Sequence, residues 1–207
     1  MAFSSRRIAA PAIIMIVAAQ PAWAHHVMGG KMPETFLQGL LSGFGHPVIG
    51  VDHLAAIVGV GILAALAARS AGIVLAFSVA VIAGVGLHLG KIDLPASELF
   101  VGLTTLVIGA LVVARQSMGR GLALLLFGVA GLVHGYALGE SIVGAEPSPL
   151  VAYILGLLIV QSAIGVVVYA AVRSLAHWPA RTAGLAAVGV LVALAGGIAT
   201  AAAAGLT

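Results

Sequence analysis

The sequence predicts an all-α, polytopic membrane protein with six transmembrane helices after a cleavable signal peptide. Of its 207 residues, 62% are hydrophobic and only 7% are charged, and the mean hydropathy is +1.22. The apolar residues form stretches of about 20, which is long enough to cross a bilayer as helices. No polar segment is long enough for a second, soluble domain.

The first 24 residues have the pattern of a signal peptide. Arg6 and Arg7 form a charged start, residues 8–19 are apolar, and Ala22-Trp23-Ala24 matches the small-x-small cleavage pattern. Cleavage after residue 24 would expose a new N-terminus. The alternative is an uncleaved signal anchor.

The mature chain, residues 25–207, is predicted to form one six-helix transmembrane domain. Its apolar stretches cover residues 46–68, 71–90, 97–114, 121–139, 150–172 and 183–204. Residues 33–45 are expected to form a short interfacial helix, because Pro33-Glu34 suits a helix start. The mature start, His25-His26, would join a free α-amine to an imidazole, a chelate for nickel, copper or zinc. A disordered polar terminus is the alternative for these two residues.

Charged residues in the links predict the direction of the helices. If the mature N-terminus lies outside, the cytoplasmic links hold only basic residues: Arg69, Arg115, Arg120, Arg173 and Arg181. The outer segments hold the acidic residues and two lysines: Glu34, Asp93, Glu98, Glu140, Glu146, Lys31 and Lys91. This asymmetry follows the positive-inside rule. We therefore expect the inner membrane of a bacterium, with both mature termini in the periplasm.

Composition and missing motifs exclude several classes of function. Cysteine is absent, so the chain has no disulfide and no thiolate metal site. No Gly-Lys-Ser/Thr phosphate loop occurs, so the chain itself does not hydrolyse ATP. The net charge is only +3, without a basic patch containing aromatic residues, and no nucleic-acid partner is expected.

Potential ligand residues from four spans are predicted to lie at one depth near the outer face. Measured along a helix from the nearest cytoplasmic arginine, His53 lies about 24 Å away and His134 about 21 Å. The same estimate gives about 26 Å for Glu98 and about 28 Å for His88. Ionisable residues inside a membrane are costly and usually functional. Their shared depth indicates a binding site that is entered from outside.

The segment from His46 to His53 contains the densest group of possible ligands. On a straight helix His46 and His53 would lie about 10 Å apart along the axis, too far for one ion with bonds of about 2.0–2.1 Å. Pro47 and Gly50 are expected to break the helix near Asp52, which would allow a shared site. In the alternative, His46 caps the helix at the interface and only Asp52-His53 is buried.

A second cluster, from His134 to Glu140, repeats a histidine followed six residues later by an acid. A 3+3 internal duplication is conceivable, although both clusters are predicted near the same face, unlike an inverted repeat. A structural histidine bonded to a neighbouring helix is the alternative for His134. Glu98 follows Pro95 at a predicted helix start, where the helix dipole also favours an acid. Gln161 and Ser162 are expected to join helices through hydrogen bonds.

These residues carry a resemblance to the HupE/UreJ family of small nickel/cobalt permeases. The matching features are the His-Pro-x-x-Gly-x-Asp-His motif at 46–53, the histidine start of the mature chain, Pro95-x-x-Glu98, and His134-Gly135-Tyr136-Ala137 with Glu140. The motif is also similar to the His-x4-Asp-His signature of the larger nickel/cobalt transporter family, with one extra residue in the spacing. Family members often carry a Thr and a His in the fifth span, where this chain has Gln161-Ser162.

The resemblance implies a secondary transporter, not an enzyme, that takes up Ni²⁺ or Co²⁺ from the periplasm for urease, hydrogenase or cobalamin assembly. Imidazole and carboxylate groups independently suit borderline divalent ions, and Zn²⁺ or Cu²⁺ are further candidates in vitro. The expected metal ligands are His46, Asp52, His53, His134 and His88, with capture or attraction of the ion by His25, His26, Glu98 and Glu140. The metal is cargo and no tightly bound cofactor is expected. The expected partners are the ion and the lipid bilayer, and oligomerisation is open.

Two other functions fit the same residues. An intramembrane zinc hydrolase would use histidine and aspartate ligands around an activated water. A metal-capturing accessory protein would pass the ion to a partner without transporting it.

Overall fold

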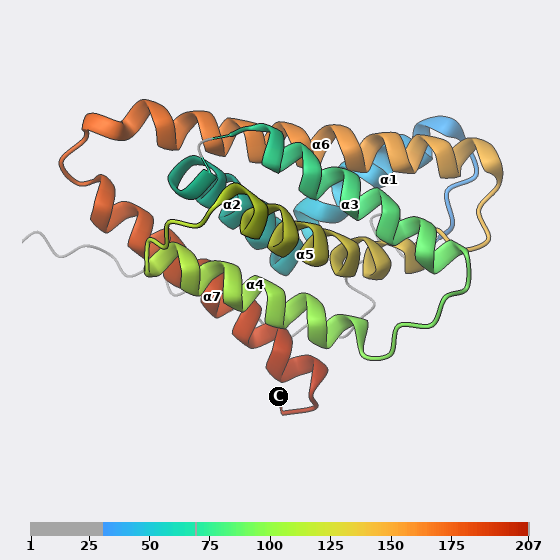
Figure 1. The fold of residues 1–207 in the computed structure, drawn as a ribbon. Coiled ribbons are helices and arrows are strands. Elements are labelled where there is room, and N and C mark those ends of the chain that lie inside the picture. The colour runs from blue at the N-terminus through green and yellow to red at the C-terminus, as the bar shows by residue number, and fades with distance from the viewer. Residues whose placement is uncertain (1–30, 69, 207) are drawn as a thin grey trace, which may run out of the picture.

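A computed structural model describes residues 31–68 and 70–206, and within them the chain is helical with no strand (Figure 1). The elements in chain order are α1 (Phe36–Ile49), α2 (Val51–Leu63), a π-helical turn η2 (Ala64–Ala68), α3 (Gly72–Leu89), α4 (Ser97–Val113), α5 (Arg120–Glu140), α6 (Pro147–Ser174), a 3-10 turn η3 (Leu175–His177) and α7 (Arg181–Ala203). The predicted signal peptide and His25-His26 lie outside the described residues.

The lengths and hydropathies of the helices confirm the all-α membrane class. In the described part of the chain, α3, α5, α6 and α7 are each long and apolar enough to span a membrane. The bent pair α1 and α2 together passes the same test, and α4 is a shorter apolar helix of 17 residues. At 1.5 Å per residue, α4 is about 26 Å long, slightly less than a typical hydrocarbon core.

The predicted break in the first apolar segment is confirmed, although its position changes the helix boundaries. The chain bends by 78° between α1 and α2, and Gly50 is both the C-cap of α1 and the N-cap of α2. We expected the first helix to stop at residue 45, but α1 continues to Ile49 and contains His46 and Pro47. Pro47 cannot donate a backbone hydrogen bond and its ring crowds the carbonyl four residues earlier, so it favours the end of the helix two residues later. His46 and His53 therefore belong to different helices.

Small residues pair the helices closely, because they allow two backbones to approach. The pairs are α1 with α6, α3 with α5, and α4 with α7. A Cβ atom at Gly131 would lie 2.6 Å from the Phe77 carbonyl oxygen of α3. Gly84 also lies at such a contact, whereas nothing lies within 4 Å of a Cβ atom placed at Gly86 or Gly128.

Helix α2 lies in the middle of the bundle and contacts α4, α6 and α7 (Figure 1). Its side chains are almost completely buried from Ala56 to Leu63. A helix that is apolar all round is typical of such a central position. The first turn of α2 therefore delivers Asp52 and His53 to the interior of the protein.

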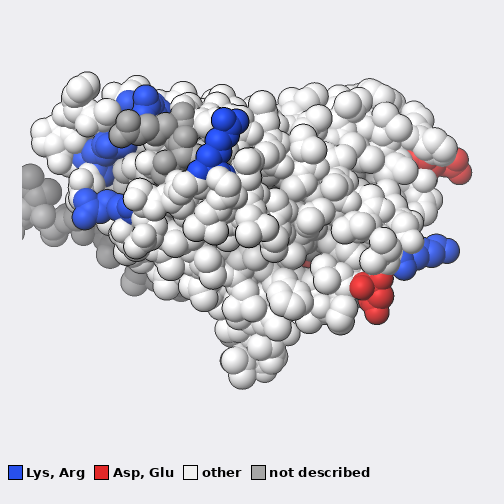
Figure 2. All heavy atoms as spheres, in the orientation of Figure 1, with Lys and Arg blue, Asp and Glu red and all other residues white. Residues whose placement is uncertain are grey.

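Charged side chains separate between the two ends of the bundle. Figure 2 shows arginine side chains gathered at the end where α4 passes to α5 and α6 passes to α7, while a basic side chain also lies beside the acidic ones at the opposite end, where the link from α3 to α4 carries Lys91. Arg115 lies in the first of these links, and Arg120, Arg173 and Arg181 lie in the helix ends beside them. At the opposite end, the acidic residues Asp93 and Glu146 lie in the links and Glu140 is the last residue of α5. We call these two regions the basic end and the acidic end.

Candidate metal site

The closest approach between predicted ligands joins His53 of α2 to His134 of α5. Their Nδ1 atoms lie 2.9 Å apart, and the two rings meet edge to face with centroids 4.9 Å apart. Both side chains are buried, with 3% of His53 and 1% of His134 exposed. We call these two residues the histidine pair. The contact brings together two residues that lie 81 positions apart in the sequence.

Two threonines of α4 contact the other side of the His134 ring. The hydroxyl oxygens of Thr104 and Thr105 lie 3.2 and 3.4 Å from His134 Nε2. Sequence reasoning missed both residues. The available signal was a pair of hydroxyls in an otherwise apolar span, but the sequence does not say which helix they face.

Asp52 is buried beside the histidine pair. Its Oδ1 accepts a hydrogen bond from the backbone N–H of His53 at 2.8 Å, and 8% of the residue is exposed. The carboxylate lies in the first turn of α2, where the positive end of the helix dipole stabilises negative charge. The backbone carbonyl of Asp52 is 3.4 Å from the Thr105 hydroxyl, so α2 and α4 meet at this point.

Gly50 provides space for the His53 ring. Its φ of −70° and ψ of 101° are accessible to other residues, so the bend itself does not require glycine. A Cβ atom at this position would lie 2.8 Å from His53 Cδ2 and 3.4 Å from Asp52 Oδ1. The glycine is therefore needed because the imidazole lies against the backbone.

His46 lies in a second polar cluster, formed with Ser141 and Tyr153 and called here the His46 cluster. The His46 Nδ1 is 3.1 Å from the Ser141 hydroxyl and 3.2 Å from the Tyr153 hydroxyl. Both hydroxyls can donate to the Leu138 carbonyl, at 3.0 Å for Ser141 and 2.8 Å for Tyr153. This cluster joins α1 to α6 and to the end of α5. Ser141 and Tyr153 were not among the predicted site residues.

The remaining predicted residues lie toward the acidic end of the bundle. His88, near the end of α3, packs its ring against Tyr136 with centroids 4.5 Å apart. Glu98 is exposed in the first turn of α4, as its helix-start pattern predicted, and Glu140 is exposed at the end of α5.

Within residues 31–68 and 70–206, no three His, Asp or Glu side chains are grouped closely enough to hold one metal ion. The arrangement contains a two-histidine core with a carboxylate on the adjacent residue, and His46 in a neighbouring hydroxyl cluster. Gln161 in α6 is 2% exposed, and its Nε2 has no hydrogen-bond partner in the described part of the chain. The expected helix-joining hydrogen bond from this amide nitrogen is therefore not formed there.

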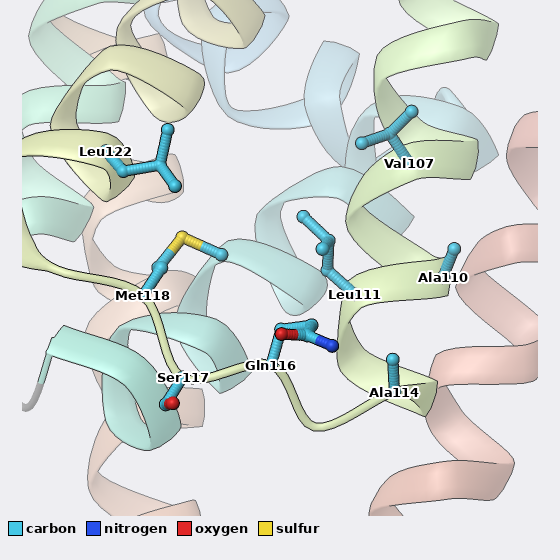
Figure 3. Close-up of a pocket in the computed structure, with 8 residues that line it drawn as sticks. All are labelled: Val107, Ala110, Leu111, Ala114, Gln116, Ser117, Met118 and Leu122. Atoms are coloured by element: carbon cyan, nitrogen blue, oxygen red, sulfur yellow. The ribbon is translucent and has the colours of Figure 1, made fainter.

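A cavity of about 390 Å³ lies elsewhere, at the basic end where α4 passes to α5 (Figure 3). Its lining is mostly apolar and consists of Val107, Ala110, Leu111, Ala114, Gln116, Ser117, Met118 and Leu122. None of the predicted ligand residues lines it. The cavity is therefore separate from the candidate metal site.

Comparison with known sequences identifies the family of this chain. The family described as HupE / UreJ protein matches residues 13–199. Protein HupE of Rhizobium leguminosarum bv. viciae is 36% identical over 103 residues, which make up 49% of this chain and 54% of that protein. The match thus spans about half the length of this curated relative, and no solved structure matches the chain. Because the family match covers most of the sequence, the chain belongs to the HupE / UreJ family.

Proposed function

We propose that this protein is a permease that carries Ni²⁺ or Co²⁺ from the periplasm across the inner membrane. The observation that carries the proposal is the buried histidine pair, whose Nδ1 atoms lie 2.9 Å apart inside an apolar helical bundle. Membership of the HupE / UreJ family, which the sequence motifs linked to nickel and cobalt transport, supports the same function.

The spacing of the histidine pair suits a divalent transition metal. With metal–nitrogen bonds of about 2.0–2.1 Å, two ligands at a 90° angle lie about 2.9 Å apart, and two tetrahedral ligands about 3.4 Å. The observed 2.9 Å is the length of a hydrogen bond between the two nitrogens, and it is close enough to the first value that small ring movements would bring both Nδ1 atoms to one ion. Ligands at 90° occur in square-planar and octahedral complexes, and tetragonal nitrogen and oxygen sites are typical of Ni²⁺ and Cu²⁺.

In this proposal the ion binds first to His53 and His134. Asp52, on the adjacent residue, supplies a carboxylate once its side chain has turned toward the ion, because the three side chains are not grouped closely enough for one ion as they lie in the described structure. His46 becomes a ligand when the bend at Gly50 changes, because α1 carries it independently of α2. His25 and His26 capture the ion, while His88, Glu98 and Glu140 attract it toward the acidic end. Six spans, a cleaved signal peptide and periplasmic mature termini complete the proposal, with the basic end in the cytoplasm as the positive-inside rule requires.

Transport by the purified protein is the direct test. The full chain is reconstituted into liposomes that contain a metal-sensing dye, and Ni²⁺, Co²⁺, Zn²⁺ and Cu²⁺ are supplied in parallel. We expect influx of Ni²⁺ or Co²⁺ that falls at least about tenfold in His53→Ala, because loss of even a supporting residue at a metal site commonly costs 10–100-fold. His177→Ala is the matched control, since His177 is exposed in η3.

Three results would contradict the proposal. Undiminished influx with His53→Ala would show that the histidine pair does not bind the transported ion. Binding of Ni²⁺ without influx would indicate an accessory protein, and turnover of liposome lipid with stoichiometric zinc would indicate a hydrolase.

A further inference from the structure

We propose that Thr104 and Thr105 are positioning residues that fix the tautomer of His134, so that this histidine binds an ion through Nδ1 and not through Nε2. Both hydroxyls lie on α4 within hydrogen-bond distance of His134 Nε2, at 3.2 and 3.4 Å. The importance of this tautomer for ion binding rests on the proposed function, whereas the tautomer itself does not.

The first step concerns the protons of the two hydroxyls, since each threonine has one proton to donate. Thr104 Oγ1 lies 2.8 Å from the Phe100 carbonyl oxygen, and Thr105 Oγ1 lies 2.9 Å from the Val101 carbonyl oxygen. Such bonds to the carbonyl four residues earlier are common for threonine in apolar helices. With both protons donated to the backbone, the two hydroxyl oxygens present lone pairs to His134.

The second step follows from the chemistry of imidazole. Two hydroxyl lone pairs facing Nε2 require a proton on that nitrogen. A neutral histidine carries one ring proton, so the Nδ1 of His134 is then an acceptor. The His53 Nδ1, 2.9 Å away, therefore donates to it. All hydrogen-bond roles in the chain from α4 through His134 to His53 are consistent with this single assignment.

The third step concerns ion binding. A hydrogen bond on the second nitrogen of a ligand histidine orients the ring and makes the first nitrogen a better ligand. Thr105 is completely buried, so bulk water does not reach its hydrogen bond with His134, and Thr104 is partly buried. For one ion to bind both Nδ1 atoms, the Nδ1 proton of His53 moves to its Nε2. The threonines thus select which nitrogen of His134 faces the ion.

The tautomer can be measured directly by ¹⁵N NMR of the purified full-length protein with labelled histidine. The His134→Asn variant identifies the His134 signals by their loss. In the ion-free wild type we expect a protonated Nε2 and an unprotonated Nδ1 for His134. In the Thr104→Val/Thr105→Val double variant, which keeps the side-chain shape, we expect the Nδ1–H form to appear and Ni²⁺ affinity to fall about 10–100-fold.

Two further variants separate positioning from stability. The single variant Thr105→Ser keeps a hydroxyl at this position. It should retain the wild-type tautomer of His134 and the wild-type Ni²⁺ affinity. Thr200→Val is the matched control, because Thr200 also donates to the carbonyl four residues earlier, at 2.7 Å, but in α7. It should leave the His134 signals unchanged.

The outcomes distinguish this inference from the proposed function. An Nδ1–H tautomer of His134 in the wild type, or unchanged His134 signals in a folded double variant, would overturn the inference. If the tautomer responds as expected but the wild type neither binds nor transports Ni²⁺, the positioning by threonine stands and the proposed function fails.

Discussion

The histidine pair and the His46 cluster use the same side chain in two different environments. The His46 Nδ1 faces two hydroxyls, which can act as donors or acceptors and so satisfy the ring within the protein. The Nδ1 atoms of His53 and His134 face each other instead, at 2.9 Å. Two imidazoles can share only one proton between these atoms. The hydroxyl cluster is therefore suited to join helices, whereas in the proposed function an ion binds between the two Nδ1 atoms after the shared proton has moved to His53 Nε2.

The break at Gly50 separates these two environments. His46 and His53 belong to one motif of eight residues, yet α1 carries His46 to α6 while α2 carries His53 to α5. A chain bent by 78° allows the two histidines to act independently. The comparison teaches that spacing within a motif does not establish that its residues share one ion.

The largest expected effect on Ni²⁺ affinity comes from removing either member of the histidine pair. His53→Ala and His134→Ala should each lower Ni²⁺ affinity by about 100-fold or more, since they remove a ligand and not only its support. The double variant should be little worse than either single variant, because both bind the same ion. Isothermal titration of the purified protein measures these affinities.

His46→Ala is the corresponding comparison for the hydroxyl cluster. We expect a smaller loss of affinity, and the loss should add to that of His53→Ala, because the two residues lie in different clusters. Non-additive losses for His46 and His53 would show that His46 joins the ion of the histidine pair through a change of the bend at Gly50.

An intermediate effect is expected from Gly50→Ala. The new methyl group would lie 2.8 Å from His53 Cδ2, so the ring must move away from its position against the backbone. A displacement of a ligand by a fraction of an ångström should lower Ni²⁺ affinity by about tenfold, comparable to the loss of a supporting contact. Gly86→Ala is the matched control, because nothing lies within 4 Å of a Cβ there. Equal Ni²⁺ affinities of the two variants would show that ion binding does not depend on the position that Gly50 allows the His53 ring.

The smallest effect on the ion is expected from Tyr153→Phe in the His46 cluster. The substitution removes the hydroxyl that donates to Leu138 and lies near His46 Nδ1. The free energy of unfolding should fall by about 1 kcal/mol, the usual value of one hydrogen bond, because Ser141 still reaches both partners. Ni²⁺ affinity should change less than threefold. Denaturant titration and isothermal titration measure the two quantities, and a loss of affinity without a loss of stability would place Tyr153 at the ion.

Sequence reasoning found the buried histidines but not their partners. His53 and His134 were expected at one depth because depth follows from the number of residues between each histidine and the basic links. Thr104, Thr105, Ser141 and Tyr153 were missed, because their contacts depend on the rotation of each helix about its axis. In a membrane helix that is apolar on all sides, hydropathy does not reveal this rotation.

The sequence by itself determined the membrane class, the approximate helices and the break in the first apolar segment. These features depend on local properties: apolar length, charged links, and the effect of proline and glycine on a helix. The charge difference between the basic and acidic ends was also readable from the links alone.

Only the tertiary structure showed that His53 meets His134 and the threonines, while His46 meets Ser141 and Tyr153. Small residues that permit close packing occur in every helix, so they do not specify which helices pair. The chemistry of each histidine depends on the atoms that face its ring nitrogens, and these neighbours come from parts of the chain distant in the sequence.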